Sequence, residues 1–145
     1  MNKLNVLVDT FVWSEALRRK KNDISSENTF IYHLIKNEEE ILLTGSIIQE
    51  ILTGITNTKL FEEIEYHLNF FHYLELDKKE YSEAAKLRNQ CAQKGVAVTT
   101  IDCQIATLAI HRNIYLATYD SDFQLIAKHT NLKVLNFENY KKMKR

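Results

Sequence analysis

Short apolar segments alternate with longer stretches of helical periodicity along this chain. The apolar segments are residues 4–8, 40–44, 72–76, 114–117 and 132–135. The stretches with apolar residues at helical spacing are 10–21, 24–37, 46–54, 59–70, 77–95, 100–113 or 102–113, and 121–127. Parallel strands need long crossover connections, which are usually helices. The alternation therefore predicts an α/β fold, with a mainly parallel central sheet and helices on both of its faces.

The size and composition of the chain favour one ordinary globular domain. Its 145 residues are 45% hydrophobic and 26% charged, so a single core over residues 1–145 is expected. Nineteen basic and 19 acidic side chains cancel, and net charge gives no support for a nucleic-acid partner. Attraction for phosphate would then have to come from a local basic patch or from bound cations.

Several other classes of protein are excluded by the motifs that the sequence does not contain. Cys91 and Cys103 have neither C-x-x-C nor zinc-ligand spacing, and the five histidines form no H-E-x-x-H motif. The sequence contains no run of about 18 apolar residues, so no membrane helix is predicted. We expect a cytoplasmic protein with reduced thiols and no membrane partner.

Acidic residues stand at positions where an α/β fold places its ligands. Asp9 follows the first strand directly, and Asp120 follows the fourth after two residues. Ligands bind beyond the carboxyl ends of parallel strands. Asp102 at the start of one helix and Glu50 one turn inside another can project toward the same edge. The sequence predicts that these carboxylates converge.

Each acid also has a structural explanation. Asp102 and Asp122 are N-caps by type and position, with Ser46 and Ser121 as further candidate caps, and Asp9 is acceptable in a turn. Glu50 is the hardest to explain in this way, because its neighbours on the predicted helix are mostly aliphatic and a charge there requires a partner. The sequence alone leaves open whether Asp122 is a metal ligand or a helix N-cap.

Converging carboxylates imply bound cations. Without them, each carboxylate would raise the pKa of the others. Oxygen ligands suit Mg²⁺ or Mn²⁺, whereas zinc favours the histidine and cysteine pattern that is missing. One or two such ions can activate water and stabilise a leaving oxygen. The acidic set therefore predicts hydrolysis of phosphodiester bonds.

Four segments, in order, resemble the PIN-domain family, in particular the VapC-type toxins of bacterial and archaeal toxin–antitoxin pairs. They are VLVDTFVW at 6–13, SIIQEIL at 46–52, DCQIA at 102–106 and LATYDSDF at 116–123. One departure is Phe11, where many relatives carry a small polar residue. Together the segments span nearly the whole chain.

The resemblance implies a three-layer sandwich and a metal-dependent nuclease. In this family Asp9, Glu50, Asp102 and Asp120 would be catalytic and would bind Mg²⁺ or Mn²⁺, with Asp122 as an additional or alternative ligand. The hydroxyls at matching positions that would support the site are those of Thr10, Ser46 and Thr118. The resemblance also implies an RNA substrate, a homodimer and a small antitoxin protein as partner.

An endoribonuclease toxin is the function that these observations favour. The alternatives are a housekeeping RNA-processing nuclease and a non-catalytic scaffold of the same fold that binds RNA or protein. Phosphoryl transfer on a small molecule ranks lower, because Asp9-Thr10-Phe11 lacks the D-x-D of the haloacid-dehalogenase-like group. The basic segments at 18–21 and 141–145 are more typical of a solvated helix end and a frayed terminus than of RNA contacts.

Overall fold

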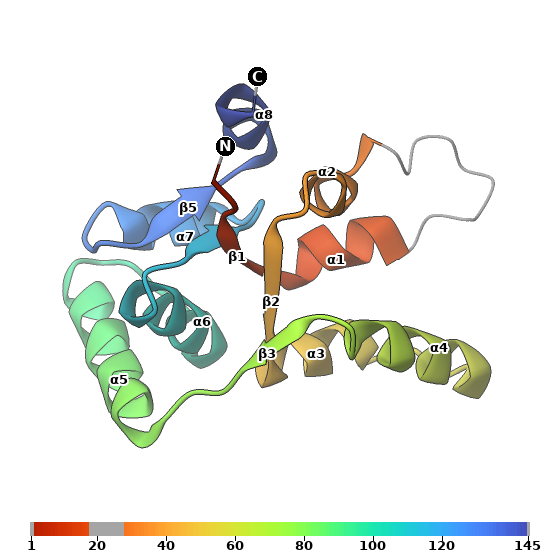
Figure 1. The fold of residues 1–145 in the computed structure, drawn as a ribbon. Helices are drawn as coiled ribbons and strands as arrows, with labels where there is room; N and C mark the ends of the chain where they lie inside the picture. The colour runs from red at the N-terminus through yellow and green to blue at the C-terminus, as the bar shows by residue number, and fades with distance from the viewer. Residues whose placement is uncertain (1, 18–27, 145) are drawn as a thin grey trace. The chain divides into compact units, whose positions relative to one another are not determined.

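The structure is a computed structural model in which residues 2–17 and 28–144 are described (Figure 1). The chain divides into two compact units, residues 1–75 and 76–145, and each is described by itself. Within the described residues, no helix is long and apolar enough to cross a membrane.

In its described residues, the first unit contains three parallel strands and four helices. The strands are β1 (Asn5–Val8), β2 (Glu40–Thr44) and β3 (His72–Leu74). The helices are α1 (Thr10–Leu17), α2 (Phe30–Lys36), α3 (Gly45–Leu52) and α4 (Thr58–Leu68). Strand β2 pairs with both others, with Val6 opposite Ile41 and Leu42 opposite His72. Val6 and Leu7 are fully buried, as expected of strands covered by helices.

Two helices of this unit begin differently from the sequence expectation. Helix α2 begins at Phe30, where the side chain of Thr29 accepts the backbone N–H of Tyr32. The predicted start of this helix, at residue 24, lies outside the described residues. Helix α3 follows β2 without a loop, and the extended residue Thr44 is its N-cap. The expectation that Ser46 caps α3 is wrong, because the backbone has already turned helical at Gly45.

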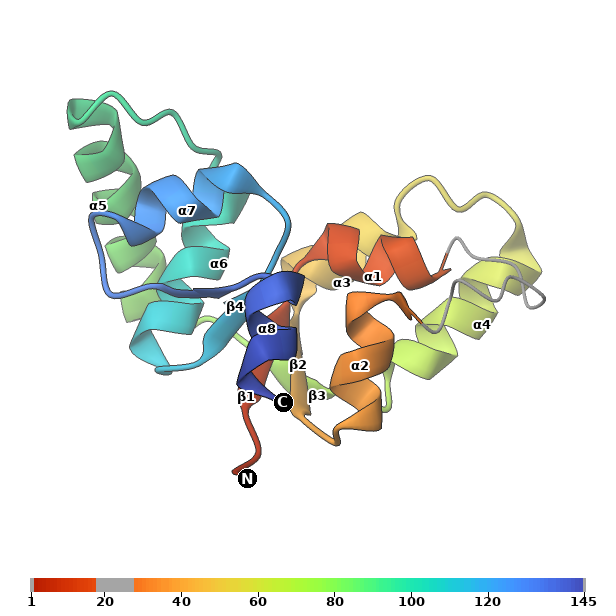
Figure 2. The same cartoon turned by 90° about the horizontal axis from the view of Figure 1, so that it is seen from above.

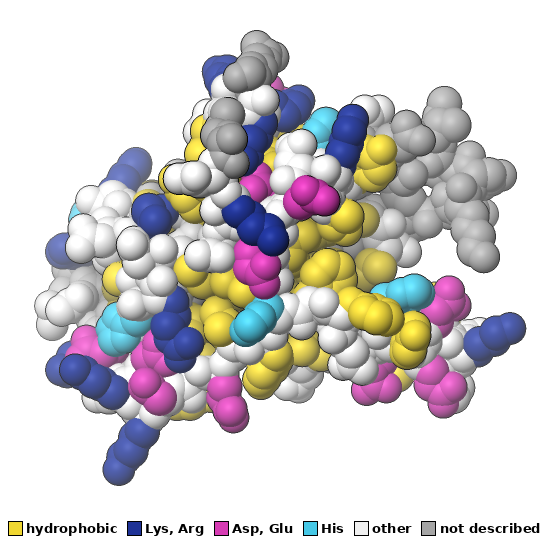
Figure 3. Space-filling view, viewed as in Figure 1, with side chains coloured by type: hydrophobic (Ala, Val, Ile, Leu, Met, Phe, Trp, Pro, Cys, Tyr) yellow, Lys and Arg dark blue, Asp and Glu magenta, His cyan; other side chains and the backbone are white. Residues whose placement is uncertain are grey.

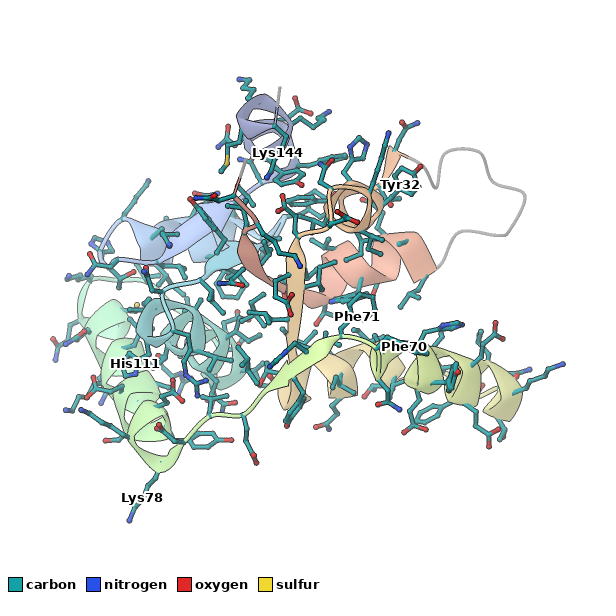
Figure 4. All side chains as sticks on the ribbon, in the orientation of Figure 1. Tyr32, Phe70, Phe71, Lys78, His111 and Lys144 are labelled. Atoms are coloured by element: carbon teal, nitrogen blue, oxygen red, sulfur yellow. The ribbon has the colours of Figure 1, made fainter. Side chains whose placement is uncertain are left out.

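Aromatic side chains pack together next to the start of β3 in the first unit. Phe71 packs edge-on against Trp13, with ring centroids 4.9 Å apart, and the Trp13 indole donates a hydrogen bond to the carbonyl of Val8. Phe70, labelled with Phe71 in Figure 4, is instead 70% exposed. The Trp13 contacts fix α1 against the end of β1, which is where Asp9 stands.

Over residues 76–144, the second unit contains two parallel strands and four helices. The helices are α5 (Lys78–Gln93), α6 (Thr100–His111), α7 (Ser121–Ala127) and α8 (Phe137–Met143), and the strands are β4 (Tyr115–Ala117) and β5 (Lys133–Leu135). Leu116 of β4 lies opposite Val134 of β5. Figures 1 and 2 show α5 and α6 side by side. Helix α8 replaces the expected frayed tail, because Asn136 caps it and Tyr140 is fully buried.

A buried ion pair joins the two longest helices of this unit. Asp77 and Glu80 form the capping box that begins α5. Glu80, only 2% exposed, also accepts two hydrogen bonds of 2.9 Å from Arg112 at the end of α6. These hydrogen bonds are the main cause of the lowered pKa of Glu80. His111, labelled in Figure 4, lies 3.8 Å from the same carboxylate.

Parallel strands alternate with helices in both units, so the predicted α/β class is confirmed. Basic and acidic side chains are interspersed on the face shown in Figure 3. In the C-terminal basic segment, Lys141 pairs with Glu138 and lies over the ring of Phe137. The other basic segment, 18–21, lies outside the described residues.

Candidate metal centre

Three carboxylates gather in the second unit. Asp102, Asp120 and Asp122 each offer an oxygen, and these oxygens lie within 4.8 Å of one another. All three residues are intermediate in exposure, so their side chains are partly accessible to a ligand. The structure thus brings together the three acids that the sequence places at a strand end and at two helix starts.

Asp102 is positioned by the cap of its helix. The N-cap of α6 is Thr99, whose hydroxyl accepts the backbone N–H of Asp102 at 3.0 Å. The expectation that Asp102 is itself the N-cap is therefore wrong: Asp102 is the third residue of the helix. Sequence reasoning missed Thr99, although Thr-x-x-Asp spacing is a recognisable variant of the capping pattern.

A short hydrogen-bond chain positions the other two acids. The buried hydroxyl of Thr118 accepts the backbone N–H of Asp120 at 3.0 Å. Asp120 Oδ1 accepts the backbone N–H of Asp122 at 2.8 Å, which makes Asp120 the N-cap of α7. The expectation that Asp122 caps α7 is therefore wrong. Helix capping does not explain an acid at position 122.

The donor set fits a hard divalent cation. Three close carboxylate oxygens are the ligands that Mg²⁺ and Mn²⁺ take in proteins. Cys103, the residue after Asp102, does not change this assignment. Burial is the main cause that raises the pKa of its thiol to about 11, and the side chain, 1% exposed, is not part of the three-carboxylate group.

The first unit places its two predicted acids around one threonine. Asp9 is 7% exposed at the end of β1, and its Oδ1 accepts the backbone N–H of Thr10 at 2.8 Å. The hydroxyl of Thr10 donates to Glu50 Oε1, also at 2.8 Å. Glu50 is exposed, so the expectation that its charge requires a partner on an apolar helix is wrong. Thr10 nevertheless links the carboxylates of Asp9 and Glu50 through its backbone N–H and its hydroxyl.

Ser46 adds an unsatisfied hydroxyl to this group. It lies one turn before Glu50 on α3, and its buried Oγ has no hydrogen-bond partner in the described part of the chain. A buried hydroxyl without a partner is destabilising by about 1–3 kcal/mol. A ligand or ordered water at this position would remove that penalty.

Comparison with known proteins places the chain in a family. The PIN domain profile matches residues 6–129. The VapC ribonuclease Mb1587 of Mycobacterium bovis is 30% identical over 135 residues, which cover 91% of this chain and 98% of that protein. Ribonuclease VapC11 of Mycobacterium tuberculosis matches with the same identity and coverage.

Solved structures share the fold. FitAcB from Neisseria gonorrhoeae superimposes with a TM-score of 0.71 at 21% identity, covering 91% of this chain and 97% of that chain. VapBC2 from Rickettsia felis, bound to a DNA fragment from its promoter, gives a TM-score of 0.70 at 20% identity, covering 92% and 98%. The resemblance seen in the four sequence segments is confirmed, and the chain belongs to the PIN-domain family.

Proposed function

We propose that this protein is an Mg²⁺- or Mn²⁺-dependent endoribonuclease and the toxin of a type II toxin–antitoxin pair. The observation that carries the proposal is the cluster of Asp102, Asp120 and Asp122, whose oxygens lie within 4.8 Å of one another. The mycobacterial relatives named as VapC ribonucleases support RNA as the substrate. The balanced net charge is compatible with this, because a bound cation reverses the sign of an acidic site.

Asp9, Glu50, Asp102 and Asp120 are the proposed catalytic residues and metal ligands, with Asp122 as a further ligand. When bound, the cation would neutralise and polarise the phosphodiester oxygens. The protein's own threonines hold the ligands: Thr10 orients Glu50, and Thr118 fixes the backbone of Asp120. Ser46 offers a hydroxyl beside Glu50 that a substrate oxygen or a water can use.

The first experiment measures RNA cleavage by the Asp102→Asn variant with Mg²⁺, Mn²⁺ or EDTA. We expect the rate of cleavage to fall by more than about 100-fold. Loss of a group that only orients a metal ligand already lowers activity or metal affinity by about 10–100-fold. Glu63→Gln on the exposed side of α4 is the control and should cleave normally. Full activity of Asp102→Asn, or activity that survives EDTA, would contradict the mechanism.

A non-catalytic scaffold of the same fold makes a different prediction. Isothermal titration of the wild-type protein with Mn²⁺ should show binding that is weakened in Asp102→Asn. If millimolar Mn²⁺ does not bind and no RNA is cut, the scaffold is the better interpretation. This measurement does not depend on knowing the natural RNA.

The proposed partners are a small antitoxin, an RNA and a second copy of the chain, all in the cytoplasm. Solved VapBC and toxin–antitoxin assemblies of the same fold support the antitoxin. Expression of this protein alone should arrest growth, and co-expression of a small protein encoded beside it should restore growth. Unimpaired growth with active nuclease would favour a housekeeping RNA-processing enzyme.

A further inference from the structure

A cavity of about 290 Å³ opens between α5 and α6 in the second unit. Its volume is near the lower end of the range for small-molecule sites, about 300–1,000 Å³. It is separate from the three-carboxylate cluster, and the proposed mechanism gives it no role. Its side chains of interest are Tyr81, Arg88 and Asn89 on α5 and Thr100 and Gln104 on α6.

The floor of this cavity is apolar and uncharged. Ala84 and Cys103 line it and are 5% and 1% exposed. Tyr81, on the same cavity, is 51% exposed and presents an aromatic ring to solvent. Such a surface suits the flat face of another ring.

The remaining lining residues offer hydrogen bonds that the protein does not use. The side chains of Asn89, Thr100 and Gln104 make no hydrogen bond with any other residue that the structure describes. Each amide carries two donor hydrogens and an acceptor oxygen, which matches the mixed edge of a nucleobase. Single-stranded RNA is recognised in this way, by stacking on aromatic rings and by hydrogen bonds to base edges.

The charge of the cavity disfavours a cation. Arg88 is the one charged side chain among its lining residues, all of which are described. Arg88 donates through Nε to the carbonyl of Val98 at 3.1 Å, which anchors it beside the loop before α6. A planar guanidinium held in this way can stack on a base or donate to its edge.

The position of the cavity relates it to the carboxylates. Thr100 and Gln104 stand two residues before and after Asp102 on α6. At 3.6 residues per turn, both lie about 200° around the helix from Asp102. The cavity and the three-carboxylate cluster therefore lie on opposite sides of the same end of α6. An RNA strand that has a phosphate at Asp102 and crosses this end of α6 would bring a neighbouring base to the cavity.

We propose that the α5–α6 cavity is a nucleobase subsite, which binds an unpaired base flanking the cleaved phosphate and sets the sequence preference of the enzyme. The inference rests on the proposed ribonuclease function for the identity of the substrate. Binding of a base can nevertheless be measured without cleavage, so the two proposals can fail separately.

The binding experiment uses the full chain in EDTA and the four nucleoside 5′-monophosphates. The side-chain amide signals of Asn89 and Gln104 are followed by ¹H–¹⁵N NMR. We expect both signals to move with one or two of the nucleotides, and the same shifts in Asp102→Asn. The Gln104→Ala variant should lose the shift at Asn89, whereas Gln124→Ala, an exposed amide on α7, should keep it. The absence of shifts with all four nucleotides would overturn the subsite.

The cleavage experiment uses RNA with a randomised sequence and determines the bases on each side of the cut. In Gln104→Ala, the preference at one position should fall by about 5- to 100-fold, the discrimination of a good base contact. The KM of the favoured RNA should rise, and the kcat should stay near that of the wild type. An unchanged preference in Gln104→Ala overturns the subsite. If the wild type cuts no RNA, the proposed function fails. The nucleotide titration still shows whether the cavity binds a base.

Discussion

Hydroxyl groups beside the acids determine how the carboxylates are held. Thr10 donates to Glu50, and Thr118 accepts the N–H of Asp120. Each bond ties an acid, or the backbone next to it, to a residue at the carboxyl end of a strand. At the residue scale, then, the positions of the acids depend on threonines that carry no charge.

Thr118→Val tests this support. Valine keeps the shape and removes the acceptor of the Asp120 N–H, so we expect a loss of about 1–2 kcal/mol in the free energy of unfolding. RNA cleavage should fall by about 10–100-fold. Thr53→Val is the control, because the Thr53 hydroxyl bonds a helix carbonyl in an exposed position. Chemical denaturation and cleavage assays measure the two effects. An unchanged cleavage rate would show that Thr118 does not support the site.

Asp120→Asn and Asp122→Asn separate capping from metal binding. Asparagine caps helices about as well as aspartate, so Asp120→Asn should unfold at nearly the wild-type temperature. Both variants should bind Mn²⁺ at least about 10-fold more weakly in isothermal titration, since each loses a charged oxygen ligand. Wild-type affinity of Asp122→Asn would show that this residue is not a ligand.

At the element scale, one ion pair fixes α5 to α6. Glu80 begins α5 and Arg112 ends α6, so their two hydrogen bonds set how the antiparallel helices align. The same alignment shapes the α5–α6 cavity near the other end of α6, where Thr100 and Gln104 face α5. A contact without catalytic groups thus positions the helix that carries Asp102.

Glu80→Gln should destabilise the protein in a pH-dependent way. The folded-state pKa of Glu80 lies below its ordinary value of 4.5, chiefly because Arg112 hydrogen-bonds to it. The stabilisation is therefore present above about pH 4.5 and is lost as the pH falls through the lower folded-state pKa. We expect a difference from wild type of about 2 kcal/mol at pH 7 that closes under acid conditions.

Urea denaturation between pH 3 and pH 7 measures this difference. Glu83→Gln is the matched control: its pair with Lys86 is on the surface, so the loss should stay below about 1 kcal/mol. A difference for Glu80→Gln that is the same at every pH would mean that its charge contributes little.

At the scale of the whole molecule, a bound metal should stabilise the folded chain. A ligand that binds only the folded state adds about 2.7 kcal/mol at 100 times its dissociation constant. The melting temperature should therefore rise with Mn²⁺ and return to its starting value with EDTA. Asp9→Asn and Asp102→Asn should each weaken the response, and each variant tests the carboxylates of its own unit. A response retained in both would contradict the ligand assignment.

The sequence by itself determined the order of strands and helices and the positions of the acids at their ends. These features follow from local periodicity, so β2 was predicted with its observed bounds at Glu40–Thr44. The family resemblance added the roles of the acids, which no local pattern contains. Helix α8 was missed because its burial depends on Tyr140 meeting the core, which is a tertiary contact.

Only the tertiary structure decided which residues share hydrogen bonds. Whether Asp120 or Asp122 caps α7 depends on where the backbone turns helical, and composition near a helix start does not fix that point to within two residues. Glu80 and Arg112 are 32 positions apart, and Asn89 and Gln104 meet at one cavity only because α5 packs on α6. The sequence set the chemistry available at each position, and packing between distant segments selected which groups meet.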